Sequence, residues 1–333
     1  MLCPTGRCID KIMKMLKFLA LTLSIVGALT IMLFYEGDIP RDVVDARYSS
    51  PNSQFLELDD LGRIHYRDEG HRRSLPVVLL HGSNASLHTF EPWVAELEDQ
   101  YRLITIDLPG HGLTGAIPSG DYSYAAMIRV VEEVLDHLRV DQFVIGGNSM
   151  GGGLAWRYTL QNPDKVLALV LIDSSSPMIW RNDDDSNEVW AFELLKKPWF
   201  RAIARNMDPY YLVAQGLRSA YNHSAVVDEQ LIMRYNDMML REGTREATVA
   251  RFGLQDSHGA DADLSKINVP TLLMWGKEDA VTPFAFASEF ENTIPDVTTA
   301  YYDRLGHLPM EEDPATTAED LDQFLSSLTQ DQS

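Results

Sequence analysis

A lone serine surrounded by glycines is the first candidate for chemistry in this chain. Ser149 lies in GNSMG (147–151), which fits the pattern G-x-S-x-G, with an apolar run before it and a helix-like stretch after it. A serine at such a strand–turn–helix junction occupies a strained backbone, and small neighbours let the strand and the helix approach closely. The sequence therefore predicts that Ser149 is an exposed nucleophile.

A serine hydroxyl is a weak nucleophile, so it needs a histidine base, and the base needs an acid that orients it. With this type of turn, the acid and then the histidine are expected to follow the serine. Asp279 follows the apolar run PTLLMW (270–275), and His307 is the only histidine beyond residue 258. We therefore expect a triad of Ser149, Asp279 and His307, with Glu278 as the alternative acid.

The tetrahedral intermediate of such a reaction needs N–H donors for its oxyanion. The sequence HGSNAS (81–86) follows the apolar run PVVLL (76–80). The pattern places one donor in such a loop and the other directly after the nucleophile, so we predict the backbone amides of Ser83 and Met150. The residues expected to bind the substrate beside these donors are His81, Gly82, Asn84, Asn148 and Leu308.

Composition and motifs exclude several other classes of function. The chain of 333 residues has 28 basic and 49 acidic residues, a net charge of −21, which disfavours nucleic acid as a partner. The sequence contains no HExxH and no paired CxxC, so we predict no metal site. GHGLTG (110–115) matches G-x-G-x-x-G, but Pro118 and Gly120 follow where a dinucleotide site needs a helix. We therefore interpret this match as accidental.

The N-terminus combines a basic segment with an uncharged apolar segment. Four basic residues precede residues 18–35, and acidic residues follow at 36–38. Eighteen helical residues span about 27 Å, close to the thickness of a hydrocarbon core. This predicts a transmembrane anchor with the catalytic domain on the exported side of the membrane. A cleaved signal peptide is the alternative, although its apolar core would normally be shorter.

Strand-like and helix-like segments alternate from about residue 52. Two segments with alternating apolar and polar residues (53–58 and 63–68) are typical of antiparallel strands, and five short apolar runs are typical of strands buried on both faces. This alternation predicts a mostly parallel α/β sheet. No such strand occurs from 178 to 263, which we interpret as a helical cap. The expected organisation is a basic tail (1–17), an anchor or uncleaved signal (18–35), a linker (36–51), the α/β core (52–177), the cap (178–263) and the rest of the core (264–333).

Five motifs occur in an order that is similar to that of a known family. They are HGSNAS, DLPGHG (107–112), GNSMGG (147–152), GKEDAVTP (276–283) and GHLPMEEDP (306–314). On these motifs the chain resembles the α/β-hydrolase superfamily, specifically the capped serine hydrolases, over nearly all of residues 52–330. The resemblance implies an eight-stranded, mostly parallel sheet flanked by helices, no cofactor, and hydrolysis of a carboxylic ester through an acyl-enzyme. The expected partner is a small ester with an apolar acyl group.

Three other activities of this fold stay open. GNSMGG resembles the turn of hydrolases that cleave ring-fission products, which are vinylogous diketones, across a carbon–carbon bond. Those enzymes usually have a tryptophan after the catalytic histidine, where this chain has Leu308. Perhydrolysis as a side activity is compatible with the same triad. A receptor for a small apolar ligand, with a slow triad, is the third alternative. Ser149 argues against dehalogenases and epoxide hydrolases of this fold, which have aspartate at that position.

Overall fold

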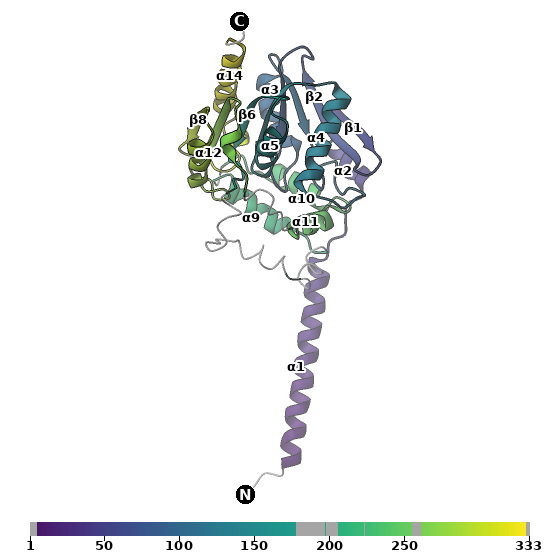
Figure 1. Ribbon diagram of the computed structural model, residues 1–333. Helices are drawn as coiled ribbons and strands as arrows, with labels where there is room; N and C mark the ends of the chain where they lie inside the picture. The colour runs from purple at the N-terminus through teal and green to yellow at the C-terminus, as the bar shows by residue number, and fades with distance from the viewer. Residues whose placement is uncertain (1–4, 178–196, 198–205, 223, 255–260, 331–333) are drawn as a thin grey trace.

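The computed structural model of the chain describes residues 5–177, 197, 206–222, 224–254 and 261–330 (Figure 1). The sheet contains β1 (Ser53–Leu58), β2 (Gly62–Gly70), β3 (Pro76–Leu80), β4 (Arg102–Ile106), β5 (Phe143–Asn148), β6 (Val166–Ile172), β7 (Thr271–Gly276) and β8 (Val297–Tyr302). The described α-helices are α1 (Thr5–Phe34), α2 (Arg41–Tyr48), α3 (Glu91–Leu97), α4 (Tyr124–Leu138), α5 (Met150–Gln161), α9 (Tyr210–Ala220), α10 (Glu229–Leu240), α11 (Thr244–Phe252), α12 (Ala287–Thr293), α13 (Pro309–Glu312) and α14 (Pro314–Gln330). Short 3₁₀ helices are η1 (Leu87–Phe90), η3 (Leu264–Lys266) and η4 (Phe284–Phe286).

The eight strands form one sheet in the order β1-β2-β4-β3-β5-β6-β7-β8. β1 and β2 pair antiparallel with their neighbours, and β3 to β8 are parallel to one another. This confirms the predicted fold class, including the two antiparallel strands at the start. The chain order reverses at β3, which lies between β4 and β5. The carboxyl ends of β3 and β5 therefore form the switch point where open α/β sheets bind their ligands.

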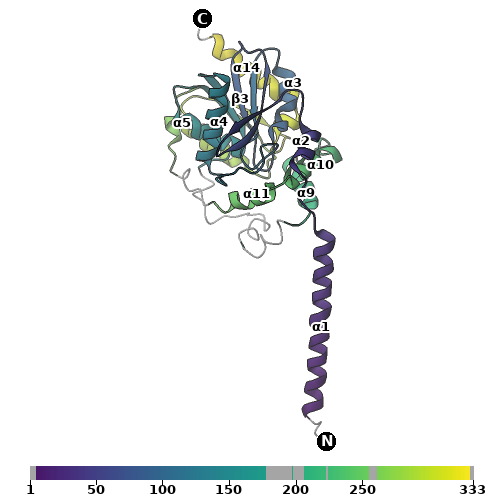
Figure 2. The same ribbon diagram turned by 90° about the vertical axis from the view of Figure 1, so that its right-hand side faces the viewer.

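Both faces of the sheet are covered by helices, which explains why its central strands are apolar throughout. One core cluster packs Val78 and Leu80 of β3 against α4, α5 and α12. The other packs Val77 and Leu79 of the same strand against α3 and α14. Alternate residues of β3 thus contact opposite helical layers, with α4 on one side of the strand and α3 on the other (Figure 2).

The prediction of a membrane anchor is wrong. Residues 18–35 were expected to form it, but they belong almost entirely to α1, which projects away from the body (Figures 1 and 2). Because α1 begins at Thr5, it also includes the charged side chains of Arg7, Lys11, Lys14 and Lys17. Among the described residues, no helix has both the length and the apolar character needed to span a bilayer. The expected membrane partner and exported location rested on this anchor and lose their basis.

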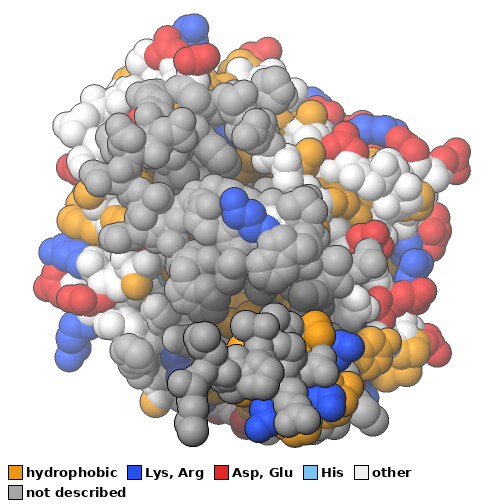
Figure 3. Space-filling model, turned by 90° about the horizontal axis from the view of Figure 1, so that it is seen from below, with side chains coloured by type: hydrophobic (Ala, Val, Ile, Leu, Met, Phe, Trp, Pro, Cys, Tyr) orange, Lys and Arg blue, Asp and Glu red, His pale blue; other side chains and the backbone are white. Residues whose placement is uncertain are grey.

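The helices α9, α10 and α11 lie beyond the carboxyl ends of the parallel strands (Figure 1). The last residue of α9, Ala220, accepts a hydrogen bond from the His307 amide (2.7 Å), and Arg251 of α11 contacts Met150. Side chains of both charges surround the rim of this face (Figure 3). Part of the interval 178–263 lies outside the described residues, so its role as a cap stays a prediction.

Candidate functional site

Ser149 occupies the tight turn between β5 and α5. Its backbone has φ 53° and ψ −116°, a strained conformation for a residue with a side chain. A Cβ added to Gly147 would lie 2.3 Å from the carbonyl carbon of Gly151, and one added to Gly151 would lie 2.0 Å from the Leu80 oxygen. Both glycines are therefore required by the close approach of β3, β5 and α5. The serine itself is half-buried at this turn.

The structure brings Asp279 and His307 together from the loops after β7 and β8. His307 Nδ1 lies 2.7 Å from Asp279 Oδ2, so Nδ1–H donates to the carboxylate and Nε2 is left as an acceptor. The other oxygen, Oδ1, accepts the amides of Val281 (2.7 Å) and Thr282 (2.9 Å). These two amides fix the orientation of the carboxylate, and the carboxylate in turn fixes the imidazole ring.

Asn148 connects the histidine loop to the serine turn. Its side-chain Nδ2 donates to the His307 carbonyl (2.9 Å) and to the Ile172 carbonyl (3.2 Å). Among the described residues the Ser149 hydroxyl makes no hydrogen bond to His307, and in enzymes without substrate that bond is often long. Asn148 is almost completely buried, so it holds the two loops together rather than facing open space.

Two further carboxyl groups lie near the histidine. Glu278, the alternative acid, is exposed, whereas Asp279 is buried against His307. Asp173, which directly follows β6, is fully buried and accepts the Gly276 amide (2.9 Å). Burial, reinforced by the neighbouring Asp279 charge, raises the pKa of Asp173 well above its usual range, which favours its protonated form.

The loop 81–86 lies directly beside the serine turn. A Cβ added to Gly82 would lie 2.8 Å from Asn148 Oδ1 and 3.3 Å from Ser149 Cβ. Met150 is the first residue of α5, where a backbone N–H has no acceptor within the helix. Ser83 is half-buried in the same loop. The geometry is compatible with the two predicted oxyanion donors, whose role stays a prediction.

His81 holds the loop 81–86 through hydrogen bonds to backbone groups. Its Nε2 accepts the Leu108 amide (3.0 Å), so the proton is on Nδ1, which donates to the Gly82 carbonyl (2.8 Å). Burial lowers the pKa of His81, although the nearby Asp107 charge opposes that change. Both ring nitrogens are thus used by the backbone. His81 thus positions the loop, and its role in substrate binding stays a prediction.

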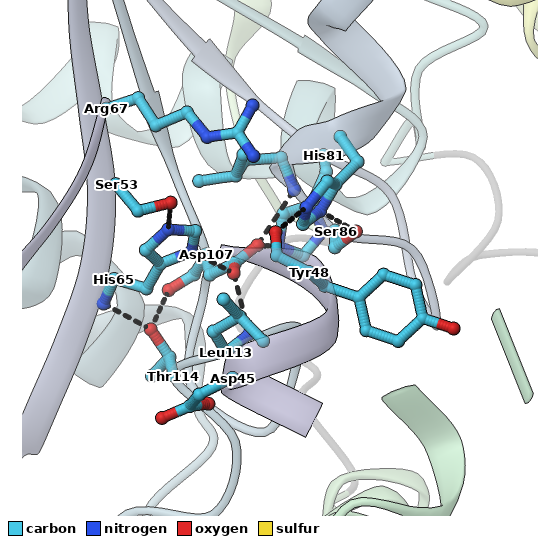
Figure 4. Close-up of polar contacts among 12 residues, drawn as sticks. Asp45, Tyr48, Ser53, His65, Arg67, His81, Ser86, Asp107, Leu113 and Thr114 are labelled. Atoms are coloured by element: carbon cyan, nitrogen blue, oxygen red, sulfur yellow. Dashed lines mark hydrogen bonds and ion pairs between the residues drawn. The ribbon is translucent and has the colours of Figure 1, made fainter. Parts of the chain in front are cut away.

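Asp107 is the centre of a buried polar cluster under the same loop (Figure 4). Its oxygens accept the amides of Leu87 (2.7 Å) and Leu113 (2.7 Å) and lie 2.6 Å from His65 Nδ1. Burial alone would raise the pKa of Asp107, but the charge and the hydrogen bond of His65 hold it well below its usual range. The cluster anchors the loop to β2. It also explains the glycine at position 112 of DLPGHG, since a Cβ added to Gly112 would overlap the Asp107 carboxylate.

Arg251 contacts two of the residues that the sequence assigns to the site. Its guanidinium donates to Asn84 Oδ1 (3.1 Å) and approaches Met150 Sδ (3.7 Å). Burial lowers the pKa of Arg251 to about 10, so it stays charged at neutral pH. Asn84 has φ 60° and reaches the guanidinium from the oxyanion loop. Leu308, the last predicted contact, is buried in the core cluster that contains α9 and α14.

One group of side chains in the described part could hold a metal ion. Asp173, Asp279 and His307 each offer one ligand atom, and these atoms lie within 4.8 Å of one another. The short His307–Asp279 hydrogen bond uses two of these atoms, so a metal would have to replace it. The arrangement therefore suits an acid–base pair better than a cation, and the absence of a metal stays a prediction.

Sequence reasoning missed Asp173, Asp107 and Arg251. Asp173 had a usable signal, because it directly follows a buried strand, as Asp279 nearly does. Asp107 lies in a motif that was recognised without a role for its carboxylate. Arg251 had no signal, since its partners Asn84 and Met150 are 167 and 101 residues away in the chain.

Several known proteins are similar to this chain in sequence or in fold. A family model described as the alpha/beta hydrolase fold matches residues 76–314. The chain is 27% identical to a 2-hydroxy-6-oxononadienedioate/2-hydroxy-6-oxononatrienedioate hydrolase of Cupriavidus pinatubonensis, over 79% of this chain and 92% of that protein. It is 30% identical to a non-heme chloroperoxidase of Streptomyces lividans, over 82% and 99%. The structure of a thermophilic esterase from Thermogutta terrifontis has a TM-score of 0.68 at 25% identity, over 83% and 99%.

Proposed function

Because this chain belongs to the α/β-hydrolase family and is a hydrolase, we propose that it cleaves carboxylic esters through an acyl-enzyme on Ser149. The observation that carries the proposal is the hydrogen bond of 2.7 Å between His307 Nδ1 and a buried, oriented Asp279. That bond leaves Nε2 as the proton acceptor, and Asn148 ties the His307 loop to the serine turn. The similarity to the Thermogutta esterase supports the choice of substrate class.

The proposed reaction has two steps. His307 Nε2 takes the hydroxyl proton as Ser149 Oγ attacks the ester carbonyl, and Asp279 stabilises the imidazolium that forms. The amides of Ser83 and Met150 donate to the oxyanion. His307 then protonates the leaving alcohol, and the acyl-enzyme remains. In the second step His307 removes a proton from water as the water oxygen attacks the acyl carbonyl. The bond between the acyl carbon and Ser149 Oγ then breaks, the acid leaves, and His307 returns its proton to Oγ, which restores the serine.

The first test measures hydrolysis of p-nitrophenyl esters of graded acyl length by the full chain and by Ser149→Ala. Removal of the nucleophile is expected to lower kcat about 10⁶-fold, to the background rate. The exposed Ser119→Ala variant is the matched control and should hydrolyse the esters like the wild type. Equal rates for wild type and Ser149→Ala would contradict the proposal.

Carbon–carbon bond hydrolysis is the second candidate, because the Cupriavidus relative is a hydrolase of a 2-hydroxy-6-oxo dienedioate. The same triad would act on a vinylogous diketone. This candidate predicts loss of the coloured dienol by the wild type, without turnover of any ester. Ester turnover that depends on Ser149, with no dienol loss, would reject it.

A further inference from the structure

A cavity lies away from the Ser149 site, between the start of β2, the start of α2 and the end of α10. Its volume is about 190 Å³. The lining consists of three arginines, two small residues, a threonine, an isoleucine and a proline: Arg41, Gly62, Arg63, Thr114, Ala116, Ile117, Pro118 and Arg241. This volume is well below the 300–1,000 Å³ typical of sites for larger organic ligands, so the cavity suits a small one.

The three arginines differ in how they are held. The side chain of Arg41 is 58% exposed and lies 3.6 Å from Glu242, which is itself exposed. Arg63 is partly exposed, donates to Asp45 Oδ2 (2.5 Å) and stacks over the Phe55 ring at 3.3 Å from its centroid. These contacts fix one guanidinium and leave the other near solvent at the mouth.

Arg241 is the buried member of the group, with only 2% of its surface exposed. Its Nη2 donates to Asp45 Oδ1 (3.2 Å), and its Nε has no hydrogen-bond partner within the described part of the chain. Burial lowers the pKa of Arg241, and Asp45 opposes that change. Arg241 is thus the buried side chain of the cavity lining.

The backbone is shaped to admit this guanidinium. Gly115 has φ +62°, and a Cβ added there would lie 2.0 Å from Arg241 Nη1. Any other residue at 115 would displace the arginine from the cavity wall. The absence of a side chain at 115 therefore leaves space for the Arg241 guanidinium.

Two of the three carboxylates that pair with these arginines are exposed. Asp45 is shared between Arg63 and Arg241, while Glu242 and Glu57 are solvent-exposed and lie 3.6 and 3.9 Å from Arg41 and Arg63. Exposed pairs at such distances contribute little. In a chain with a net charge of −21, a cavity lined by three guanidinium groups is an unusual concentration of positive charge.

We propose that this cavity binds a small oxyanion of the size of phosphate. The guanidinium fork matches the oxygens of such anions with paired N–H donors, and arginine is the side chain best suited to that recognition. Arg241 supplies the donor deep in the cavity, and Arg63 and Arg41 supply donors at its mouth. The site is separate from the proposed hydrolysis, which uses none of these residues.

The test titrates inorganic phosphate into the full chain by isothermal titration calorimetry, with potassium chloride holding the ionic strength constant. The wild type is expected to show saturable binding at one site. Arg63→Gln and Arg41→Gln should each raise the dissociation constant about tenfold, because each removes a charged donor. Arg41 forms only an exposed ion pair, so its variant is expected to fold like the wild type.

Two controls distinguish binding in this cavity from binding elsewhere on the protein. Arg72→Gln removes an exposed arginine outside the cavity lining and should bind phosphate like the wild type. Ser149→Ala should also bind it unchanged, which separates the cavity from the hydrolytic site. The proposal is overturned if the wild type shows no saturable binding, or if Arg72→Gln weakens binding as much as Arg63→Gln does.

Discussion

Two neighbouring aspartates at the site are held by different partners. Asp279 accepts two backbone amides on one oxygen and His307 on the other. Asp173 is fully buried, and burial, reinforced by the neighbouring Asp279, raises its pKa well above its usual range. Burial thus favours the protonated form of Asp173, whereas Asp279 has the donors that orient it toward the histidine.

Replacing the triad acid should reduce activity while the protein stays folded. Asp279→Asn keeps the size of the side chain but cannot hold the imidazole in the required tautomer, so we expect kcat to fall about 10⁴-fold. Glu278→Gln changes the adjacent exposed carboxylate and should retain nearly full activity. Ester hydrolysis measured for both variants checks this. A large loss in Glu278→Gln with little loss in Asp279→Asn would assign the acid to Glu278.

Single residues were predictable where a local pattern marks them. Ser149 lies in a recognisable pentapeptide, and Asp279 and His307 follow strands that the apolar runs indicate. The side chains that support them were not predictable, because their partners come from distant segments. The hydrogen bond between Asn148 and the His307 carbonyl joins residues 159 positions apart. No spacing in the sequence indicates such a contact.

Among the elements, the junction of β3, β5 and α5 sets the site. The first turn of α5 lies against the end of β3 so closely that Gly151 has no space for a methyl group. The same approach places the loop after β3 beside Ser149. Packing of backbone against backbone therefore determines how far the expected oxyanion donors lie from the nucleophile.

A methyl group at this junction should unfold the protein or force the strands apart. Gly151→Ala would bring its Cβ within 2.0 Å of the Leu80 oxygen, and we expect a loss of several kcal/mol in the free energy of unfolding. Gly216→Ala is the matched control, because nothing lies within 4 Å of its added Cβ in α9. That change should be neutral or stabilise by up to about 1 kcal/mol. Urea unfolding of both variants is the measurement, and equal stability would contradict the close packing.

The sequence pattern predicted strands in both the buried and the partly exposed parts of the sheet. The segments 53–58 and 76–80 match β1 and β3 residue for residue. The ends of β2 and β7 differ from the segments 63–68 and 270–275 by one or two residues. The anchor prediction is wrong because no helix among the described residues is both long enough and apolar enough to span a bilayer.

At the scale of the whole molecule, the segment before β1 joins the sheet to the helices beyond its carboxyl edge. Arg47 of α2 pairs with the buried Asp237 of α10 (2.8 Å), and Asp38 pairs with Arg245 of α11 (2.6 Å). Val44 of α2 is fully buried with Leu113 and Met238. These contacts join parts of the chain about 200 residues apart and hold α10 and α11 over the site.

Global stability should decrease as the pH rises from about 5 to 8. Burial, with the charge of Asp279, raises the pKa of Glu312 to about 7 from a usual 4.5. Between these values the folded chain keeps a proton that the unfolded chain has released, so the free energy of unfolding falls with rising pH. We expect Glu312→Gln, which keeps an acceptor for the Gly306 amide, to remove about 1 to 2 kcal/mol of this decline.

Urea unfolding at pH 5 and pH 8 measures this effect. The exposed Glu319→Gln variant of α14 serves as the control and should show the same decline as the wild type. If the free energy of unfolding of Glu312→Gln declines with pH as much as that of the wild type, the Glu312 carboxyl group has the same pKa in the folded and unfolded chain.

The backbone of Ser149 also bears on how such a chain changes over generations. At φ 53° and ψ −116° a residue with a side chain costs of order 1–3 kcal/mol, whereas glycine adopts this region readily. Selection for a firmly folded chain and selection for turnover therefore act in opposite directions on one codon. A descendant that no longer needs hydrolysis would gain stability by exchanging the serine for glycine, and it would keep the fold while losing the chemistry.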